Sequence, residues 1–547
     1  MKSAVNPLVA SAALVLFSGV LFCSGADPYP LAENGRALAP VVISPTASEQ
    51  TRAVAAELAS YLRQMTGAEF EVKTGDGMRG IVLGTAAEVD RDGRYRDALA
   101  LHGEYDGKEA FVIHPGKDRL LLLGATDLGV SHAAFALLEQ LGCRWFFPAK
   151  EWQVIPNRPS VVADATLFSR PKILARRIWY GYGPFPDDKK HPLGSSCAKD
   201  YEDWARHNRM ASSFRVYAGH AYEAMVANHR AIFDAHPEYL ALVKGERKKP
   251  QLCISNPAVR DFAVKWCEDF FSKNPDREMV SLDCADGGGH CECAECLKLG
   301  SISNRVFGLA NHAAKAIAKT HPGKMVGLLA YNEHSEPPDF VLEPNVYVQL
   351  TMGFIRGRYT FEELREIWPT KCRAMGFYDY YSVWLWDFDK LPGGKGAMLD
   401  HIEDSIRRNA ALGATSLDME SGNNWGVHGL GYYVANKLMW DPEADVKAIT
   451  ADFFDKAFGP AAAVMRRYYE RWMPTLQATP FMSRQLLGSL FRDLEEASRL
   501  AADRPEVLAR IDHLKHYLRY NHLRWLLDHE KDKARQKQLS LEILTLT

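Results

Sequence analysis

Residues 283–296 read DCADGGGHCECAEC and hold the densest group of reactive side chains in the sequence. Cys291, Cys293 and Cys296 follow the spacing C-x-C-x2-C, at which neighbouring thiolates can share one tetrahedral metal ion. The candidates for the fourth ligand are Cys253, Cys284 and His290. An oxidising compartment favours disulfides, whereas the tight spacing favours zinc, so disulfide pairing and structural zinc both stay open. A catalytic zinc ion fits less well, since three or four thiolates close a site.

A second set of residues combines carboxylates with aromatic rings at the ends of apolar, strand-like runs. Glycoside hydrolysis uses this combination, because one carboxylic acid protonates the leaving oxygen while a carboxylate attacks the anomeric carbon or activates water. Aromatic faces stack on sugar rings. The predicted catalytic residues, the two leads first, are Glu420, Asp286, Asp379 and Glu333. The predicted substrate-binding residues are Arg177, His220, Asp283, Trp384, Trp386, Asn423 and Trp425.

Each of these predictions competes with a purely structural interpretation. Asp286 precedes three glycines and could only shape a turn, and Glu333 could lie in a solvated loop. Asp379 stands in an aromatic run and could be a buried hydrogen-bonding residue. His220 could be a structural histidine, and Arg177 could be an ion-pair partner in the core.

The elements that must position these residues alternate between strand-like and helical runs from about residue 172. Seven strand-like runs, from ILARRIWYG to ATSLDMES, are separated by segments with helical periodicity over roughly 250 residues. This size and rhythm predict a central (β/α)8-type barrel, whose reactive groups lie at the carboxyl ends of its strands. A doubly wound sheet is the competing fold, but the sequence lacks the phosphate-binding glycine turn expected after its first strand.

The flanking segments predict three further parts. Residues 1–26 read as a signal peptide, with Lys2 before an apolar stretch and a small-residue cleavage site, so the chain is expected to be exported to the periplasm or beyond. Residues 27–168 predict a small α/β domain with helices on one face of its sheet. The barrel is expected over 169–428, and amphipathic helices over 429–547.

Composition narrows the classes of partner. The formal net charge of −2 argues against nucleic acid as a partner, and no segment after the signal peptide is apolar enough to span a membrane. A carbohydrate is the expected partner, and the oligomeric state is not predicted.

Longer stretches of the sequence resemble known families. The pattern from AAELASYLRQMTG to ALLEQLGCRWFFP is similar to the domain that precedes the barrel in family 67 α-glucuronidases and family 20 β-hexosaminidases. HPEYLALVKGERKKPQLCISNPAVR, DCADGGGHCECAEC and MESGNNWGVHGLGYYVANKLMWDPEADV resemble the bacterial domain-of-unknown-function family 4838, which is associated with carbohydrate degradation. Since the resemblance includes Cys253, it favours that residue as the fourth cysteine ligand. Family 20 enzymes are expected to carry an adjacent Asp-Glu pair, where this chain has Asn332-Glu333.

These observations predict an exported glycoside hydrolase that acts on a glycan containing uronic acid or amino sugar. No cofactor is expected for catalysis, while a structural zinc ion is expected if Cys253, Cys291, Cys293 and Cys296 do not form disulfides. The alternatives are a noncatalytic glycan-binding protein on a barrel scaffold and a zinc-dependent hydrolase.

Overall fold

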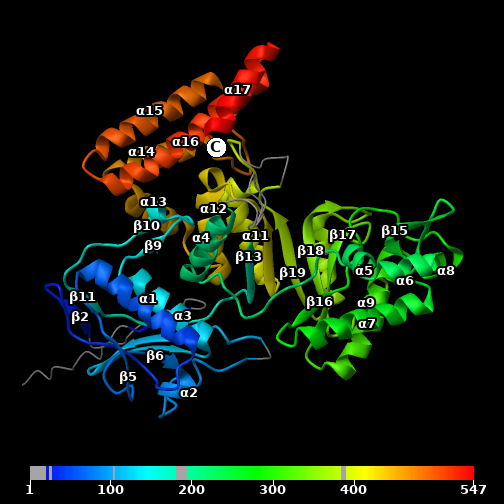
Figure 1. Ribbon diagram of the computed structural model, residues 1–547, viewed down its shortest axis with the longest axis horizontal. Coiled ribbons are helices and arrows are strands. Elements are labelled where there is room, and N and C mark those ends of the chain that lie inside the picture. Colours follow the sequence, from blue (N-terminus) through cyan, green and yellow to red (C-terminus); the bar gives the residue numbers. More distant parts are fainter. Residues whose placement is uncertain (1–19, 24–27, 103–104, 180–193, 384–389, 547) are drawn as a thin grey trace, which may run out of the picture.

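The computed structural model describes residues 20–23, 28–102, 105–179, 194–383 and 390–546. Within them lie an N-terminal α/β region, a central curled parallel sheet with its helices, and a C-terminal group of helices (Figure 1). The predicted mixed α/β class is confirmed, whereas the limits 27–168, 169–428 and 429–547 stay predictions. Every described helix is too short or too polar to cross a lipid bilayer.

The N-terminal region is built on a seven-stranded mixed sheet. In spatial order its strands are β1 (Val20–Cys23), β12 (Thr166–Ser169), β7 (Phe111–Pro115), β8 (Arg119–Gly124), β6 (Gly80–Thr85), β4 (Val41–Ile43) and β5 (Val72–Thr74). Smaller ladders are formed by β2 (Tyr29–Glu33) with β3 (Arg36–Ala37) and β11 (Val161–Ala163), and by β9 (Arg144–Trp145) with β10 (Gln153–Val154). Because β1 lies within the predicted signal peptide, cleavage after Ala26 would remove this edge strand.

The two long helices of this region form where the sequence predicts them. Helix α1 (Glu49–Thr66) begins at Ser48, whose hydroxyl accepts from the Thr51 amide, and ends at Gly67 with φ +75°. Helices α1 and α3 (Asp127–Gln140) cover one face of the sheet, as predicted. The short helix α2 (Ala86–Val89) packs against the opposite face, so the helices do not all share one face.

The central sheet contains six parallel strands. In spatial order they are β13 (Ala175–Ile178), β20 (Ser416–Glu420), β19 (Ala374–Tyr380), β18 (Val346–Ile355), β17 (Met325–Asn332) and β16 (Met279–Ser281). The connecting helices include three predicted from periodicity, namely α7 (Pro257–Lys273), α9 (Ile302–Thr320) and α11 (Leu399–Ala411). The remaining elements are α4 (Gly194–His207), α5 (Tyr222–Asn228), α6 (Arg230–Ala235), β14 (Leu240–Val243), β15 (Glu246–Leu252), α8 (Ala294–Lys298) and α10 (Phe361–Ile367).

The second predicted strand, ASSFRVYAG, does not join this sheet. The residue that follows the run, His220, makes one isolated parallel bridge with Asp283, so the described ladder holds six strands instead of the eight of a complete barrel. The Gly219 carbonyl accepts from the hydroxyl of Ser281 on β16. The Tyr217 carbonyl packs so closely over Gly327 that a Cβ there would lie 2.5 Å from it. The run therefore lies against β16 and β17 without extending their ladder.

Strand register decides which side chains share the concave face. Arg177 pairs with Asp418, and Asp418 pairs with Tyr378 on the other neighbouring strand. Two residues further along β20, Glu420 pairs with Tyr380. Since side chains alternate along a strand and paired residues point the same way, these residues form two layers at the carboxyl end of the sheet.

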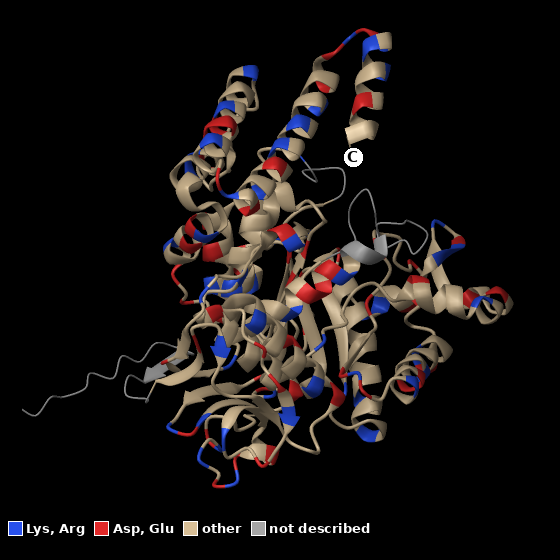
Figure 2. Cartoon of the chain, turned by 60° about the vertical axis from the view of Figure 1, so that its left-hand side comes forward, with Lys and Arg blue, Asp and Glu red and all other residues tan. Residues whose placement is uncertain are grey.

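The C-terminal region is helical, as predicted. Its helices are α12 (Trp425–Trp440), α13 (Val446–Phe458), α14 (Ala462–Trp472), α15 (Arg484–Leu500), α16 (Pro505–His529) and α17 (Lys533–Leu546). Helix α12 packs against α11 and β13, which joins this region to the sheet. Figure 2 shows Lys and Arg positions interspersed with Asp and Glu positions along the described chain, which carries a formal net charge of −2 over the full sequence.

A buried ionic network ties β13 to the N-terminal region. The guanidinium of Arg176 lies 2.5 Å from the carboxylate of Glu109, which also contacts His132 at 3.0 Å. Arg176 donates to the carbonyls of Arg209 and Ala211 as well. Burial alone would raise the pKa of Glu109, but Arg176 and His132 outweigh it and hold that pKa at about 2.

Candidate functional site

A cavity of about 510 Å³ opens at the carboxyl ends of the central strands. Three carboxylates of the described chain line it, namely Asp286, Asp418 and Glu420. Its aromatic lining includes Trp179, Tyr331, Phe354, Tyr378 and Tyr380, and its cationic groups are Arg177 and His220. The structure thus brings together four of the predicted site residues, Glu420, Asp286, Arg177 and His220, from opposite ends of the parallel sheet.

Glu420 and Asp418 project from the same face of β20. Residues two apart on a strand share a face and lie about 6.6 Å apart, so both carboxylates enter the cavity at successive depths. The Tyr378 hydroxyl donates to the Glu420 carboxylate at 2.5 Å. Glu420 is 8% exposed, which leaves it open to the cavity but enclosed on its other sides.

Asp418 forms the deeper layer of this pair. It accepts from the Trp179 indole at 2.5 Å and lies 3.6 Å from the guanidinium of Arg177. Burial raises the pKa of Asp418, although Arg177 and the hydrogen bond from Trp179 oppose the shift. Asp418 is not among the predicted site residues. The spacing Asp-x-Glu at the end of a strand-like run was the signal that could have identified it.

Asp286 reaches the cavity from the loop that follows β16. Its side chain is 63% exposed, its carboxylate accepts from the Tyr331 hydroxyl at 3.1 Å, and it lies 3.7 Å from the Nε2 atom of His220. Gly287 and Gly289 have φ of +80° and +84°, a backbone conformation that favours glycine. The loop therefore turns back behind Asp286, which keeps the carboxylate at the rim.

Asp286 and Glu420 both influence the same two cavity tyrosines, Tyr331 and Tyr380. Burial raises the pKa of Tyr331, and the negative charges of Asp286 and Glu420 raise it further. The pKa of Tyr380 is also raised, mainly by burial and by Tyr331, and further by the negative charges of Glu420 and Asp286. Both carboxylates are thus close enough to influence both phenols electrostatically. The positions of Asp286 and Glu420 in the sequence do not reveal this proximity.

His220 is held by a carboxylate behind it. Its Nδ1 atom donates to the Cys284 carbonyl at 2.9 Å and lies 3.0 Å from Asp283, which also accepts from His334 at 3.1 Å. Burial disfavours the charged imidazole, but the hydrogen bond and charge of Asp283 outweigh it and raise the pKa of His220 to about 9. His220 therefore carries a positive charge into the cavity at neutral pH.

Asp283 itself is predicted to bind substrate, and the structure places it elsewhere. Its side chain is fully buried, with no exposed surface, and it does not line the cavity. It can reach a substrate only through His220, so its role in the site is to position and charge that histidine.

The Asp283→Asn variant tests this role. Without the carboxylate, burial becomes the main influence, and we expect the pKa of His220 to fall from about 9 to 6.5 or lower. Because the His220 pKa exceeds its unfolded value, the pair stabilises the fold fully below pH 6.5 and loses that contribution as the pH rises through 9. Histidine NMR titration measures the shift, with His220→Gln to identify the resonance. Asp269→Asn on α7 is the matched control, and an unchanged His220 pKa in Asp283→Asn would contradict the role.

Asp379, a predicted catalytic reserve, faces away from the cavity. It lies between Tyr378 and Tyr380, whose side chains point inward, so alternation directs it outward. There it lies 2.7 Å from His401 and 3.2 Å from Lys395. Burial would raise its pKa, but these two partners hold it at about 2. This arrangement fits the structural interpretation of a buried hydrogen-bonding carboxylate.

Glu333, the other reserve, also lies outside the cavity lining. Asn332 has φ +50°, so the chain leaves the direction of β17 just before Glu333. The Glu333 carboxylate lies 3.6 Å from His290 and 3.8 Å from Arg356. Glu333 therefore lies beside the glycine loop, next to His290.

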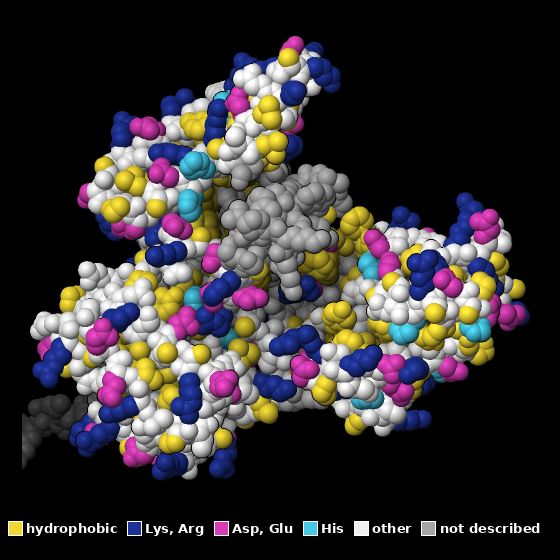
Figure 3. Space-filling view, viewed as in Figure 1, with side chains coloured by type: hydrophobic (Ala, Val, Ile, Leu, Met, Phe, Trp, Pro, Cys, Tyr) yellow, Lys and Arg dark blue, Asp and Glu magenta, His cyan; other side chains and the backbone are white. Residues whose placement is uncertain are grey.

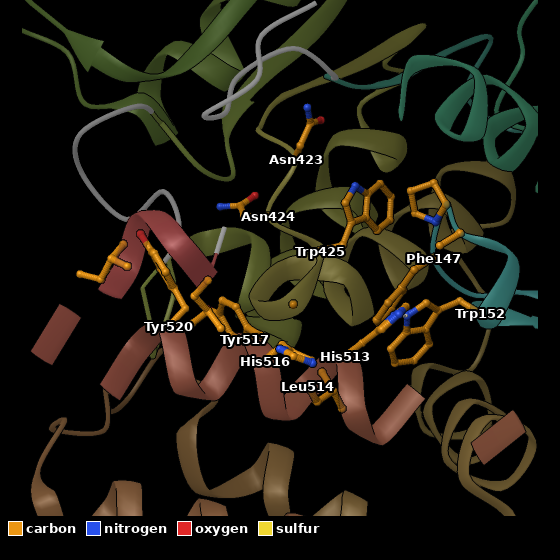
Figure 4. Close-up of a pocket in the computed structure, with 15 residues that line it drawn as sticks. Phe147, Trp152, Asn423, Asn424, Trp425, His513, Leu514, His516, Tyr517 and Tyr520 are labelled. Carbon is orange, nitrogen blue, oxygen red and sulfur yellow. Dashed lines mark hydrogen bonds between the residues drawn. The ribbon is translucent and has the colours of Figure 1, made fainter. Parts of the chain in front are cut away.

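Asn423 and Trp425, predicted to bind sugar, line a different cavity of about 600 Å³. Figure 4 shows them opposite residues of α16, with Phe147 and Trp152 at one side. Trp425 packs edge-to-face on Trp204, with ring centroids 4.8 Å apart. None of the described residues lines both cavities, so these two predictions point to a separate pocket. Trp384 and Trp386 lie outside the described residues.

The four predicted cysteine ligands converge away from the cavity. The sulfur atoms of Cys253, Cys291, Cys293 and Cys296 all lie within 4.8 Å of one another, and none of these residues lines the cavity. Cys284, His290 and His334 form a second group with ligand atoms equally close.

The surrounding face carries no dominant charge. In Figure 3, Lys and Arg side chains are intermixed with Asp and Glu side chains over the described part of this face.

Comparison with known proteins gives a family and a fold. The family model described as "Domain of unknown function (DUF4838)" matches residues 147–471. A solved family GH115 4-O-methyl-α-glucuronidase, BtGH115A, with specificity for decorated arabinogalactans, shares the fold with a TM-score of 0.59 and 15% identity over 95% of this chain and 76% of that one. CpGH84B has a TM-score of 0.50 and 10% identity over 98% and 96% of the two chains. No curated protein matches the sequence.

Proposed function

The chain belongs to the DUF4838 family, and from that premise we propose that it is a glycoside hydrolase whose two reacting carboxyl groups are Glu420 and Asp286. In such enzymes one group protonates the glycosidic oxygen, and the other attacks the anomeric carbon or activates water. The similar solved structures, described as a GH115 glucuronidase and a GH84 protein, support a glycan-acting hydrolase at the level of the fold.

One observation carries the proposal. Asp286 and Glu420, from loops and strands 134 positions apart in sequence, line the same aromatic cavity of about 510 Å³. This volume is in the range of small-molecule sites, about 300–1,000 Å³. The rings of Tyr331, Tyr378 and Tyr380 offer stacking surfaces and hydroxyl donors to a sugar.

The proposed substrate is a glycan that contains a uronic acid or an amino sugar. Among the described lining residues, Arg177 and the protonated His220 are the two cationic groups, and either can pair with a uronate carboxylate. Arg177 is 56% exposed and stacks over Trp179 at 4.6 Å, so its guanidinium can turn from Asp418 toward a ligand.

The test is a panel of aryl glycosides and natural glycans that includes α-glucuronides and N-acetyl-β-hexosaminides. We expect hydrolysis of at least one uronide or hexosaminide, with NMR of the first-formed anomer giving the stereochemistry. Binding of a glycan without any turnover would instead support the noncatalytic alternative. Cleavage confined to neutral sugars would contradict the proposed substrate class.

The zinc-dependent alternative is less well supported by the arrangement of the cysteines. Four thiolates complete a tetrahedral site and leave no position for a reacting water. The carboxylates of the cavity supply the acid and base groups that hydrolysis of a glycosidic bond requires, with no cofactor.

We also propose that the protein is exported and that residues 1–26 are removed. Mass spectrometry of the protein from an exporting host should then give Asp27 as the first residue. An intact Met1 in the exported fraction would contradict this cleavage.

A further inference from the structure

The convergence of four cysteines beside the Asp286 loop goes beyond the hydrolytic site. Cys253 follows β15, Cys291 follows the glycine loop, and Cys293 and Cys296 lie at the start of α8 and within it. Cys253, Cys291 and Cys296 are buried together in a small cluster with Ala241. This cluster is separate from the main hydrophobic core.

The sulfur positions match those around a metal ion. The Sγ atom of Cys253 lies 3.7 Å from that of Cys293 and 3.9 Å from that of Cys296. A zinc ion about 2.3 Å from each sulfur sets the edges of its ligand tetrahedron at about 3.8 Å. A disulfide would instead require about 2.05 Å. The separations therefore fit four thiolates around one ion better than paired sulfurs.

The backbone around the cluster is arranged to support negative sulfur. The amide of Leu242 donates to Cys291 at 3.3 Å, the amide of Ser255 to Cys296 at 3.4 Å, and the amide of Cys296 to Cys293 at 3.4 Å. Hydrogen bonds from outer groups orient metal ligands and spread their charge. Arg247 adds a positive charge near Cys253, and its guanidinium is held in place by donating to the Leu240 carbonyl at 2.7 Å.

We propose that Cys253, Cys291, Cys293 and Cys296 bind one structural zinc ion that fixes the loop carrying Asp286. On binding, the four thiols release their protons to solvent as four Zn–S bonds form, so no oxidant is required. The ion joins the end of β15 to the far end of this loop.

The near end of the loop is fixed by the same strand. Gln251, two residues before Cys253, donates to the Ala285 carbonyl at 2.8 Å and accepts from the Ala285 amide at 3.3 Å. At the far end, Arg305 donates to the Cys291 carbonyl at 2.8 Å. Because Asp286 lies between Gln251 and the cysteine cluster, loss of the ion should loosen the far end of the loop, where only the Arg305 contact would remain, and leave the near end fixed by Gln251.

Metal analysis of the purified full chain tests the proposal without any assay of hydrolysis. We expect about one zinc per chain, and four additional thiols that react with a thiol reagent only after the metal is removed by a chelator. Chelation should also lower the Tm of the wild type by several degrees. A metal-free folded protein whose unreduced mass lacks the hydrogens of these thiols would overturn the proposal in favour of disulfides.

Serine variants locate the ion. Cys253→Ser and Cys296→Ser are expected to lose the metal, whereas Cys372→Ser, a free cysteine outside the cluster, should retain it. Cys284→Ser should also retain it, since that residue belongs to the second group. Metal that follows Cys284 instead of Cys253 would contradict the site. If a cluster variant fails to fold, the metal content and thiol count of the wild type still decide the question.

Discussion

Glu420→Gln should lower kcat/KM on the substrate found in the panel by about 10²–10⁴-fold. The amide keeps the shape and the hydrogen bond from Tyr378, but it can neither transfer a proton nor attack the anomeric carbon. Substrate affinity should change only a few-fold, so the loss should fall mainly on kcat. Steady-state kinetics and the Kd of the unreacted substrate separate the two quantities.

Matched variants make this result specific to the cavity. Glu362→Gln removes an exposed carboxylate from α10 and should leave both constants unchanged. Asp286→Asn should lose a comparable factor to Glu420→Gln. If one of the two carboxyl groups attacks the anomeric carbon and the other supplies the proton, azide, as an external nucleophile, should restore turnover only in the variant that lacks the attacking group. Full activity of Glu420→Gln would show that the cavity acts through other residues.

Arg176→Met should lower the free energy of unfolding by about 3–5 kcal/mol, the range for breaking a buried ion pair from one side. The carboxylate of Glu109 would remain buried with His132 alone, and the two carbonyls of residues 209 and 211 would lose their donor. Chemical denaturation followed by circular dichroism measures the change.

The pH dependence of this loss follows from the lowered pKa of Glu109. That carboxylate contributes stability above its unfolded pKa of about 4.5, and the contribution disappears as the pH falls through 2. The difference between Arg176→Met and wild type should therefore be largest near pH 7 and shrink in acid.

An exposed arginine provides the control for this prediction. Arg63→Met on α1 removes the same charge, but Arg63 and its partner Glu69 are 53% and 82% exposed, so stability should change by less than about 1 kcal/mol. Glu109→Gln combined with Arg176→Met should recover part of the loss, because it removes the uncompensated charge. Equal destabilisation by the two single Arg variants would show that burial of the pair is not the cause.

Sequence and structure contribute differently to this site. Periodicity identified α1, α3, α7, α9 and α11, since a helix needs only local spacing to bury one face. The strand ends were equally readable, which is why Glu420, Asp286, Arg177 and His220 could be selected together. The run ASSFRVYAG was expected to be a strand. Its place against β16 and β17 depends on close contact with Gly327, which is 110 positions from Tyr217.

Inward and outward residues could not be separated by sequence. A parallel sheet covered on both faces gives continuous apolar runs, so the pattern around Asp379 did not show that it faces α11 while Tyr378 and Tyr380 face the cavity. The same ambiguity left Asp418 out of the predicted site, and Asn423 and Trp425, which follow β20, line the separate cavity beside α16. Each of these outcomes depends on which distant strand or helix packs on each side.

The sequence by itself determined the type of most elements, the α/β class and the residues that end the strands, because short-range periodicity and residue chemistry encode them. Only the tertiary structure decided that Asp286, Asp418 and Glu420 share one cavity, that Asp283 acts through His220, and that Cys253 meets three cysteines about 40 positions away. These are long-range contacts, and they are set by the pairing of strands and the packing of loops, which no local pattern in the chain specifies.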